Sequence, residues 1–270
     1  MRARKRFGQH FLTDSSVLDR IVTAVNLRGD DKLLEIGPGH AALTELLYPE
    51  AGSMVAVEID RDLIAMLRAR FSQLVVVNAD ILKVDLDEVL PGTDWRLVGN
   101  LPYNISSPLL IKLYGHLGRI RDMHFMFQRE LSERLAAQPG TKDWGRLSVL
   151  TQYFCHVQPL FDVPPEAFSP PPKVESQVIR LWPRDERKPV DQEVLALVLR
   201  TGFSARRKRL SNALKSLSLD WDALEALGIS PSQRPDQLGV DDYVNIACAV
   251  EQAQHATGEQ QGASERHLND

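Results

Sequence analysis

The period of apolar and polar positions changes several times along the chain, and the changes mark alternating strands and helices. Short apolar runs predict strands at 32–36, 53–59, 74–78, 96–99 and 124–127. Helical periodicity predicts a first helix that begins near Asp14 or Ser15, and further helices at 41–47, at 62–71 and from the fifth strand to Ala137. Because strands and helices alternate at short spacing, we expect an α/β domain whose parallel sheet is covered on both faces.

The pattern differs in the second half of the chain. Apolar runs at 153–163 and 174–181 flank a Pro-rich loop and predict an antiparallel pair at the sheet edge. Residues 183–189 read Pro-Arg-Asp-Glu-Arg-Lys-Pro, which is typical of a linker, and the periodicity is helical from Gln192 onward. We therefore expect one domain at 1–183, a small C-terminal helical domain at 190–253, and a polar, disordered tail at 254–270.

The composition is that of an ordinary globular protein, with 43% hydrophobic and 25% charged residues. No stretch approaches the roughly 20 apolar residues of a membrane span, and the basic N-terminus lacks the apolar region of a secretory signal. Cys155 and Cys248 have no metal-binding spacing and suit a reducing compartment. We expect a cytoplasmic, monomeric protein without a metal site or a membrane partner.

Three chemical signals follow three successive predicted strands. The first is the turn Glu35-Ile36-Gly37-Pro38-Gly39, whose glycines let the backbone approach a ligand closely. The second is Glu58, which is placed to accept hydrogen bonds from ribose hydroxyls. The third is Asp80, which can accept a hydrogen bond from an adenine amine while the backbone of Ile81 lies near the ring. Since ligands bind at the carboxyl ends of such strands, we predict a nucleotide-type cofactor there.

A nicotinamide cofactor would satisfy the same three signals, but the segment after the fourth strand favours S-adenosylmethionine. This segment is Asn100-Leu101-Pro102-Tyr103. The amine of adenine is a poor nucleophile because its lone pair is delocalised into the ring. The Asn100 side-chain oxygen and the carbonyl of Leu101 or Pro102 can accept hydrogen bonds from the amine and turn the lone pair toward a methyl group. Pro102 stiffens the loop, and Tyr103 offers a ring for stacking.

Basic residues form two clusters, although the formal net charge is -4. A charge run of this kind is often only a solvated helix face, but beside a base-modifying site it suits RNA phosphates. No acidic residue lies between Arg200 and Leu219. The clusters comprise Arg2, Arg4, Lys5 and Arg6 at the N-terminus, and Arg200, Arg206, Arg207, Lys208, Arg209 and Lys215 in the helical domain. From these we select Arg4, Lys5, Arg6, Arg206, Arg207 and Lys208 as candidate RNA contacts.

The motifs in combination resemble a known family over about residues 4–250. They lie at 7–12 (Phe-Gly-Gln-His-Phe-Leu), 35–39, 43–44, 58–60, Asp80, 100–106, 127–130 (Phe-Gln-Arg-Glu), 145–148 (Gly-Arg-Leu-Ser) and 168–174 (Phe-Ser-Pro-Pro-Pro-Lys-Val). The chain resembles the ribosomal RNA adenine N6-dimethyltransferases, and within them the bacterial small-subunit branch linked to kasugamycin sensitivity. The resemblance implies a Rossmann-like class I methyltransferase sheet and S-adenosylmethionine as cofactor. It also implies that two adjacent adenosines in a hairpin loop near the 3′ end of 16S rRNA each receive two methyl groups.

The resemblance further implies site residues. Phe168 is expected to be a second aromatic wall for the target base, opposite Tyr103, although a core Phe that anchors a rigid loop would also explain it. His10 stands where many relatives carry Asn, and both can donate to the cofactor. Ala41 stands where many members have a third Gly, a change we expect to matter little because Ala is small and the helix has begun. The expected cofactor contacts are His10, Leu12, Gly37, Gly39, Glu58, Ile59, Asp80, Ile81 and Asn100.

Two other functions fit part of the sequence. A large-subunit RNA methyltransferase of the antibiotic-resistance type would share the fold and an Asn-Leu-Pro-Tyr kind of motif. The Phe-Ser-Pro-Pro-Pro-Lys loop and the Arg206-Arg207-Lys208 cluster favour the small-subunit enzyme instead. A non-catalytic RNA-binding assembly or transcription factor on the same scaffold would be indicated by an altered cofactor turn. Gly37, Glu58, Asp80 and Asn100 are all present, so we expect an enzyme.

Overall fold

The computed structural model describes residues 10–266, with side chains for residues 10–254. The chain forms two compact units. The first comprises Met1–Glu133 and Cys155–Pro183, and the second comprises Arg134–Phe154 and Arg184–Asp270. The second unit thus includes residues 134–154, which the sequence had indicated as part of the first domain.

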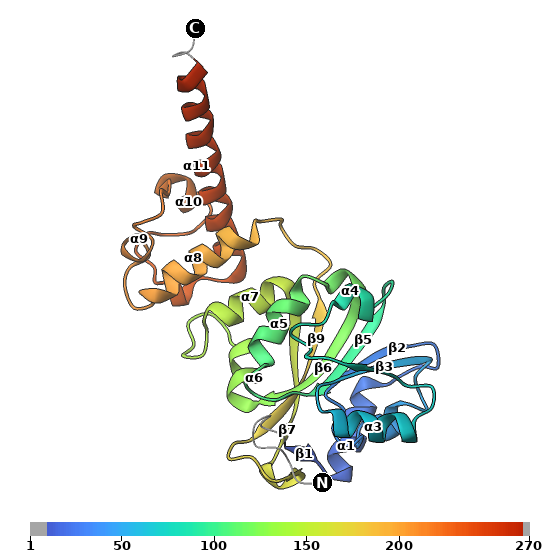
Figure 1. Ribbon diagram of the computed structural model, residues 1–270. Helices are drawn as coiled ribbons and strands as arrows, with labels where there is room; N and C mark the ends of the chain where they lie inside the picture. The colour runs from blue at the N-terminus through green and yellow to red at the C-terminus, as the bar shows by residue number, and fades with distance from the viewer. Residues whose placement is uncertain (1–9, 267–270) are drawn as a thin grey trace. The chain divides into compact units, whose positions relative to one another are not determined.

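The first unit is built on a seven-stranded sheet with the order β4-β3-β2-β5-β6-β9-β7 (Figure 1). The five neighbouring strands β4, β3, β2, β5 and β6 pair in parallel, whereas β9 pairs antiparallel with both β6 and β7. A second, two-stranded sheet pairs β1 with β8. The strands are β1 (Phe11–Leu12), β2 (Lys32–Ile36), β3 (Ser53–Glu58), β4 (Val75–Asn78), β5 (Trp95–Asn100), β6 (Ile120–Gln128), β7 (Cys155–Val163), β8 (Phe168–Ser169) and β9 (Ser176–Pro183). The predicted α/β class with a parallel sheet and an antiparallel edge is confirmed.

Helices connect the strands and cover the sheet. In the first part of the chain they are α1 (Ser15–Val25), α2 (Thr44–Leu47), α3 (Arg61–Arg70), α4 (Leu86–Val89), α5 (Ser106–Tyr114) and α6 (Arg129–Leu135). Short 3-10 turns lie at η2 (Leu117–Arg119) and η3 (Pro165–Ala167). Helix α1 begins where predicted because the Asp14 carboxylate accepts hydrogen bonds from the backbone N–H groups of Ser16 (2.8 Å) and Val17 (3.2 Å).

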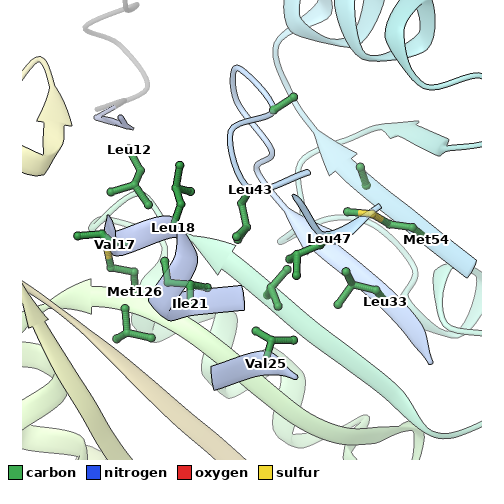
Figure 2. Close-up of a cluster of buried hydrophobic side chains, with 14 of the residues drawn as sticks. Leu12, Val17, Leu18, Ile21, Val25, Leu33, Leu43, Leu47, Met54 and Met126 are labelled. Atoms are coloured by element: carbon green, nitrogen blue, oxygen red, sulfur yellow. The ribbon is translucent and has the colours of Figure 1, made fainter. Parts of the chain in front are cut away.

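The hydrophobic core lies between α1 and the sheet. Val17, Leu18, Ile21 and Val25 point from α1 into this core, at the spacing that places them on one helix face. Figure 2 shows them beside Leu12, Leu43 and Met126, which come from segments far apart in the sequence. Burial of each such side chain contributes roughly 1.5–3 kcal/mol. The core therefore fixes the carboxyl ends of the strands, where the predicted site lies.

A buried ion cluster lies at the other ends of β2, β5 and β6. The Arg96 guanidinium donates two 2.8 Å hydrogen bonds to Asp122 and one of 3.0 Å to Asp31. Burial would raise the pKa of each carboxyl, but hydrogen bonds hold the pKa of both below their usual values: from Arg96 at Asp122, and from the Arg28 backbone N–H, Arg96 and Arg121 at Asp31. The cluster joins strands that are separated by long stretches of chain.

The second unit is helical. Its helices are α7 (Arg146–Phe154), α8 (Gln192–Ser204), α9 (Leu210–Ala213), α10 (Trp221–Glu225) and α11 (Val240–Arg266), with a 3-10 turn at η4 (Pro235–Gln237). Trp144 is almost fully buried, and its indole N–H donates to the carbonyl of Leu238 at 3.0 Å. Helix α11 continues to Arg266 through residues for which the sequence had predicted a disordered tail, and 267–270 lie outside the described residues.

Candidate active site

A cavity of about 280 Å³ lies at the carboxyl ends of the parallel strands of the first unit. All nine predicted cofactor contacts line it, although they come from the N-terminal segment and from the ends of four strands. The four residues of the Asn-Leu-Pro-Tyr segment line it as well. The cavity residues from these predictions are His10, Leu12, Gly37, Gly39, Glu58, Ile59, Asp80, Ile81, Asn100, Leu101, Pro102 and Tyr103. The predicted signals therefore share one site.

The turn after β2 has a left-handed backbone at every second residue. Gly37, Gly39 and Ala41 have φ values of 70°, 58° and 69°. A Cβ atom at Gly39 would lie 3.0 Å from the Phe11 ring, so a larger residue there would have to displace that ring and also adopt a strained φ. The expectation that the helix has begun at Ala41 is wrong: α2 begins at Thr44, and Ala41 holds a conformation that favours glycine.

Glu58 fixes this turn against the end of β3. Its buried carboxylate accepts hydrogen bonds from the backbone N–H groups of Gly39 (3.3 Å), Ile59 (2.9 Å) and Asp60 (2.9 Å). Burial raises the pKa of Glu58, and these three hydrogen bonds oppose that rise. A carboxylate offers about four acceptor positions, so Glu58 retains capacity for a ribose hydroxyl in the cavity. The residues present thus fit the ribose of a nucleoside cofactor.

Glu35 also lines the cavity, and sequence reasoning did not select it. Its side chain is buried, and the Thr44 hydroxyl donates to its carboxyl at 2.6 Å. Burial raises its pKa to about 7, and the nearby charge of Glu58 adds to the rise. The position of Glu35 two residues before Gly37 was visible in the sequence. Its burial and its hydrogen bond with Thr44 of α2 depend on how the chain packs.

The segment after β4 forms the end of the cavity predicted to hold adenine. Ile59 is 44% exposed there and Ile81 is buried, so their apolar side chains can flank a planar ring. The Lys112 ammonium group from α5 donates to the backbone carbonyl of Ile81 at 3.0 Å and to that of Val84. Lys112 therefore holds this segment in place, and no sequence motif indicated it because it lies 31 residues from Ile81.

The Asn100 side chain is oriented by the N-terminal segment. Its NH₂ group donates to the backbone carbonyl of His10 at 2.9 Å, which leaves the side-chain oxygen to accept from a ligand. The carbonyl of Pro102 already accepts from the Ile105 N–H (3.1 Å) and the Ser106 hydroxyl (3.3 Å). Of the two carbonyls that the sequence left open, the Leu101 carbonyl is therefore the better second acceptor.

Tyr103 is held with its ring facing His10. Its hydroxyl and that of Ser176 on β9 lie 3.1 Å apart and form a hydrogen bond. The ring centroids of Tyr103 and His10 are 6.0 Å apart, and the ring planes differ by only 24°. Two nearly parallel rings thus border the cavity next to Asn100.

Phe168 lies elsewhere. Its side chain is only 4% exposed and packs in the hydrophobic core with Leu12 and Val17. On β8 it pairs with Leu12, which ties the Pro-rich loop to the N-terminal strand. This placement supports the alternative that Phe168 anchors a rigid loop, and it does not support an aromatic wall.

The predicted RNA contacts divide into three groups. Arg4, Lys5 and Arg6 lie outside the described residues. Arg206 is engaged within the second unit, where its guanidinium donates to the carbonyls of Lys142 (2.8 Å) and Thr141 (2.7 Å). Arg207 and Lys208 are both exposed, so these two remain candidates for phosphate contacts.

Among the described residues, no His, Cys, Asp and Glu side chains cluster in a way that would hold a metal ion. No helix within the described part is both long enough and apolar enough to span a membrane.

The sheet, the glycine turn and the Asn-Leu-Pro-Tyr segment at one edge define an S-adenosylmethionine-dependent methyltransferase of the Rossmann-like class. Comparison with known proteins identifies the family. The family described as ribosomal RNA adenine dimethylase matches residues 1–252. The chain belongs to this family, as its motifs indicated.

Two relatives and two solved structures illustrate the similarity. The chain is 47% identical over 261 residues to ribosomal RNA small subunit methyltransferase A of Pseudomonas putida, covering 94% of this chain and 97% of that protein. It is 50% identical over 255 residues to the protein of the same name in Chromohalobacter salexigens, covering 91% and 90%. A dimethyladenosine transferase from Plasmodium falciparum superposes with a TM-score of 0.76 at 26% identity, covering 88% and 96%. The 23S rRNA methyltransferase ErmE gives 0.71 at 25% identity, covering 89% and 99%.

Proposed function

We propose that this enzyme transfers methyl groups to the N6 atoms of two adjacent adenosines in a hairpin loop near the 3′ end of 16S rRNA, two to each. The observation that carries the proposal is the orientation of Asn100. Its NH₂ group is held by the His10 carbonyl at 2.9 Å, so its oxygen is available to an amine. The similarity to proteins named for the small ribosomal subunit supports the choice of 16S rRNA over the large-subunit alternative.

The cofactor supplies an electrophilic methyl group on a sulfonium sulfur. The residues that would hold it are the Gly37–Gly39 turn, Glu58 at the ribose, and Asp80 with Ile81 at the adenine. The backbone hydrogen bonds to Glu58 and the bonds from Lys112 fix these groups before the ligand arrives. Positioning two reactants in this way can lower a barrier by up to roughly 7–11 kcal/mol.

Asn100 and Leu101 prepare the nucleophile. The Asn100 side-chain oxygen and the Leu101 carbonyl each accept one N–H of the target amine, which turns its lone pair out of conjugation and toward the methyl group. Both acceptors are fixed in a partly dry site, so little reorganisation accompanies the reaction. A strong general base is unnecessary because the amine becomes acidic once it is alkylated. Its proton leaves after methyl transfer.

The target base must leave its stack before it reaches this site, which costs a few kcal/mol and favours a loop over a duplex. Arg207 and Lys208 in the second unit, and Arg4, Lys5 and Arg6 at the N-terminus, are proposed to contact phosphates. We further propose that the enzyme acts as a monomer in the cytoplasm, on the small subunit or its precursor.

The test uses ribosomal subunits from a strain that lacks these methyl groups. The protein is incubated with methyl-labelled S-adenosylmethionine and with each purified subunit separately. We expect label in the small subunit only, and mass spectrometry should find two adjacent dimethyladenosines near the 3′ end of its rRNA. Label found in the large subunit alone would overturn the proposal, and Asn100→Ala protein is the matched control for contaminating activity.

A further inference from the structure

The edge of the large sheet carries aromatic and basic side chains that the active site does not use. Strand β7 ends the sheet, and its register places His156 opposite Trp182 of β9. Two residues further along the pair, Gln158 lies opposite Arg180. Directly opposed residues of an antiparallel pair point to the same face, and so do alternate residues of one strand. These four side chains therefore share one face of the sheet.

This face becomes exposed toward the end of β9. Val178, which precedes Arg180 on the same face, is 2% exposed and packs with α1 residues in the hydrophobic core. The Arg180 side chain is 40% exposed, Trp182 is half-buried, and His156 is exposed. Aromatic surface left in water at neighbouring positions is a common mark of an interaction site.

The outer side chains of this face are stacked. The ring centroids of His156 and Trp182 are 5.1 Å apart with an interplanar angle of 25°, and Cζ of Arg180 lies 5.1 Å from the Trp182 centroid. Among the ring contacts of the described residues, His156 has only this one, so its other ring face is open to a ligand. Within residues 10–254, the Arg180 guanidinium makes one hydrogen bond, from Nη2 to Asp122 at 2.9 Å, so Nη1 is free to donate to a ligand.

A second guanidinium lies on the same face. Arg20 of α1 is exposed, and its Cζ lies 3.9 Å from the centroid of the Phe161 ring, which is opposite Val178. Among the described residues, Arg20 has no carboxylate partner. The β7–β9 face comprises Arg20, His156, Gln158, Phe161, Arg180 and Trp182. It contains two guanidinium groups and no carboxylate, which suits a polyanion.

Unpaired RNA matches all of these groups at once. Guanidinium groups bind phosphates, and bases of any sequence stack on aromatic rings. The Gln158 amide adds a donor and an acceptor for the edge of a base. A duplex would offer only its backbone to the rings, because its bases are stacked on one another. The chemistry of the face therefore favours single-stranded nucleotides.

Strand β9 connects the β7–β9 face to the active site. Val178 lines the cavity, and Trp182 lies four residues further along the same strand. At roughly 3.3 Å per residue the two positions are about 13 Å apart. Stacked nucleotides rise by roughly 3.4 Å each, so about four of them cover this distance. One RNA molecule can therefore occupy the cavity and the face together.

We propose that the β7–β9 face binds unpaired nucleotides that adjoin the hairpin, with one base stacked on His156 and phosphates at Arg20 and Arg180. The inference goes beyond the proposed function, which concerns the reaction at the target base, but it rests on RNA as the substrate. The face holds nucleotides that are not methylated, so it contributes affinity and register rather than chemistry.

Hairpin RNAs that share the 16S 3′-end loop test this assignment by fluorescence anisotropy. One is blunt, one carries an unpaired tail of about ten nucleotides on its 5′ or its 3′ end, roughly 34 Å long when stacked, and one has the same tail annealed to its complement. Loss of one base–aromatic stack weakens binding roughly 5- to 100-fold. We expect the wild type to bind the unpaired-tail hairpin more tightly than the blunt one by a factor in this range, and the paired tail to add less.

Substitutions on the face separate stacking from phosphate binding. His156→Ala removes the outer ring and should abolish the gain from the unpaired tail, whereas His156→Phe keeps a ring and should retain the gain. Arg20→Ala should lower the slope of log affinity against log salt by about 0.7, the value for one phosphate contact on a single strand. Arg61→Ala removes an exposed arginine of α3 outside the face, and this matched control should leave the slope unchanged.

A purely structural role for the Trp182–His156 pair gives a different result, because cross-strand pairs also stabilise strand pairing. In that case His156→Ala would lower Tm but keep the full gain from the unpaired tail, and the inference would be overturned. An equal gain from the paired tail would also overturn it. Photocrosslinking is an independent readout: a tail that contains 4-thiouridine should crosslink within Cys155–Val163 or Ser176–Pro183, and crosslinks confined to other segments would contradict the proposal.

The outcomes separate this inference from the proposed function. If the wild type methylated small subunits but gained nothing from the unpaired tail, the β7–β9 face would be wrong and the proposed function would stand; a surface for a protein partner would give this result. If the wild type gained affinity from the tail and crosslinked to it on the face but left small subunits unmethylated, the proposed function would fail and the face would stand.

Discussion

The strongest test of the mechanism is the replacement of Asn100, because one side chain makes two separable contacts. Its NH₂ group donates to the His10 carbonyl at 2.9 Å, and its oxygen is proposed to accept from the target amine. Asn100→Ala removes both contacts. Asn100→Asp keeps an acceptor but replaces the donor, so two oxygens would face each other where the hydrogen bond was.

The expected magnitudes follow from these contacts. Removing a fixed hydrogen-bonding group that acts on the transition state costs about 100- to 1,000-fold in kcat. We expect a loss in this range or larger for Asn100→Ala, since the orientation of the loop is disturbed as well. In Asn100→Asp the His10 carbonyl is left facing an oxygen, and an acceptor left unpaired in this way costs about 1–3 kcal/mol, which corresponds to a loss of roughly 5- to 150-fold. The rates should therefore rank wild type above Asp, and Asp above Ala.

The assay is single-turnover methyl transfer to unmethylated small subunits with saturating labelled cofactor, so that product release does not limit the rate. RNA binding is measured separately and should stay within a few-fold of the wild type in both variants. An Asn100→Ala protein that methylates within tenfold of the wild-type rate would refute the proposed activation of the amine. An Asp variant slower than the Ala variant would refute the inferred orientation of the amide.

Three further predictions concern other parts of the molecule. Glu35 has a folded-state pKa of about 7, above its ordinary 4.5, so its burial favours the neutral form. The free energy of unfolding of the ligand-free protein should therefore fall by up to about 3 kcal/mol as pH rises from 4.5 through about 7, and urea titrations at several pH values would measure this fall. In Glu35→Gln the contribution of this carboxyl to the fall should be absent. Lys112→Met should raise KM for S-adenosylmethionine with a smaller effect on kcat, because it frees the carbonyls of the adenine-binding segment; an unchanged KM would contradict this. Arg207→Glu with Lys208→Glu should weaken RNA binding and flatten its salt dependence without changing cofactor affinity, as filter binding at several salt concentrations would show.

Local pattern predicted the parallel sheet well, because each buried strand is a continuous apolar run that ends at a polar or glycine residue. The cofactor side of the site was equally accessible, since Gly37, Glu58 and Asp80 each follow a strand and parallel strands end at one edge. Helix α7 was missed because its residues are only partly apolar and its burial depends on α8 and α11, which lie far along the chain. Local periodicity contains no information about such partners.

The errors at the site have the same origin. Ala41 was placed at the start of the helix predicted at 41–47, but it follows the turn around Gly37 and Gly39 and has a left-handed backbone. Arg206 was grouped with its basic neighbours, although carbonyls more than 60 positions away engage its guanidinium. The relation of His10 to Tyr103 spans 93 positions and has no sequence signature. Long-range contacts, which decide what each side chain does, are visible only in three dimensions.

The discontinuous second unit has a practical consequence for dissecting the enzyme. A truncation after Pro183, which the linker sequence invites, would keep residues 134–154 but remove the helices against which they pack within their unit. Trp144 would lose the Leu238 carbonyl and its apolar surroundings, leaving a large aromatic surface in water. Such a fragment should aggregate. An isolated catalytic unit would instead require excision of 134–154 and a short peptide joining Glu133 to Cys155, which makes an internal deletion the appropriate design.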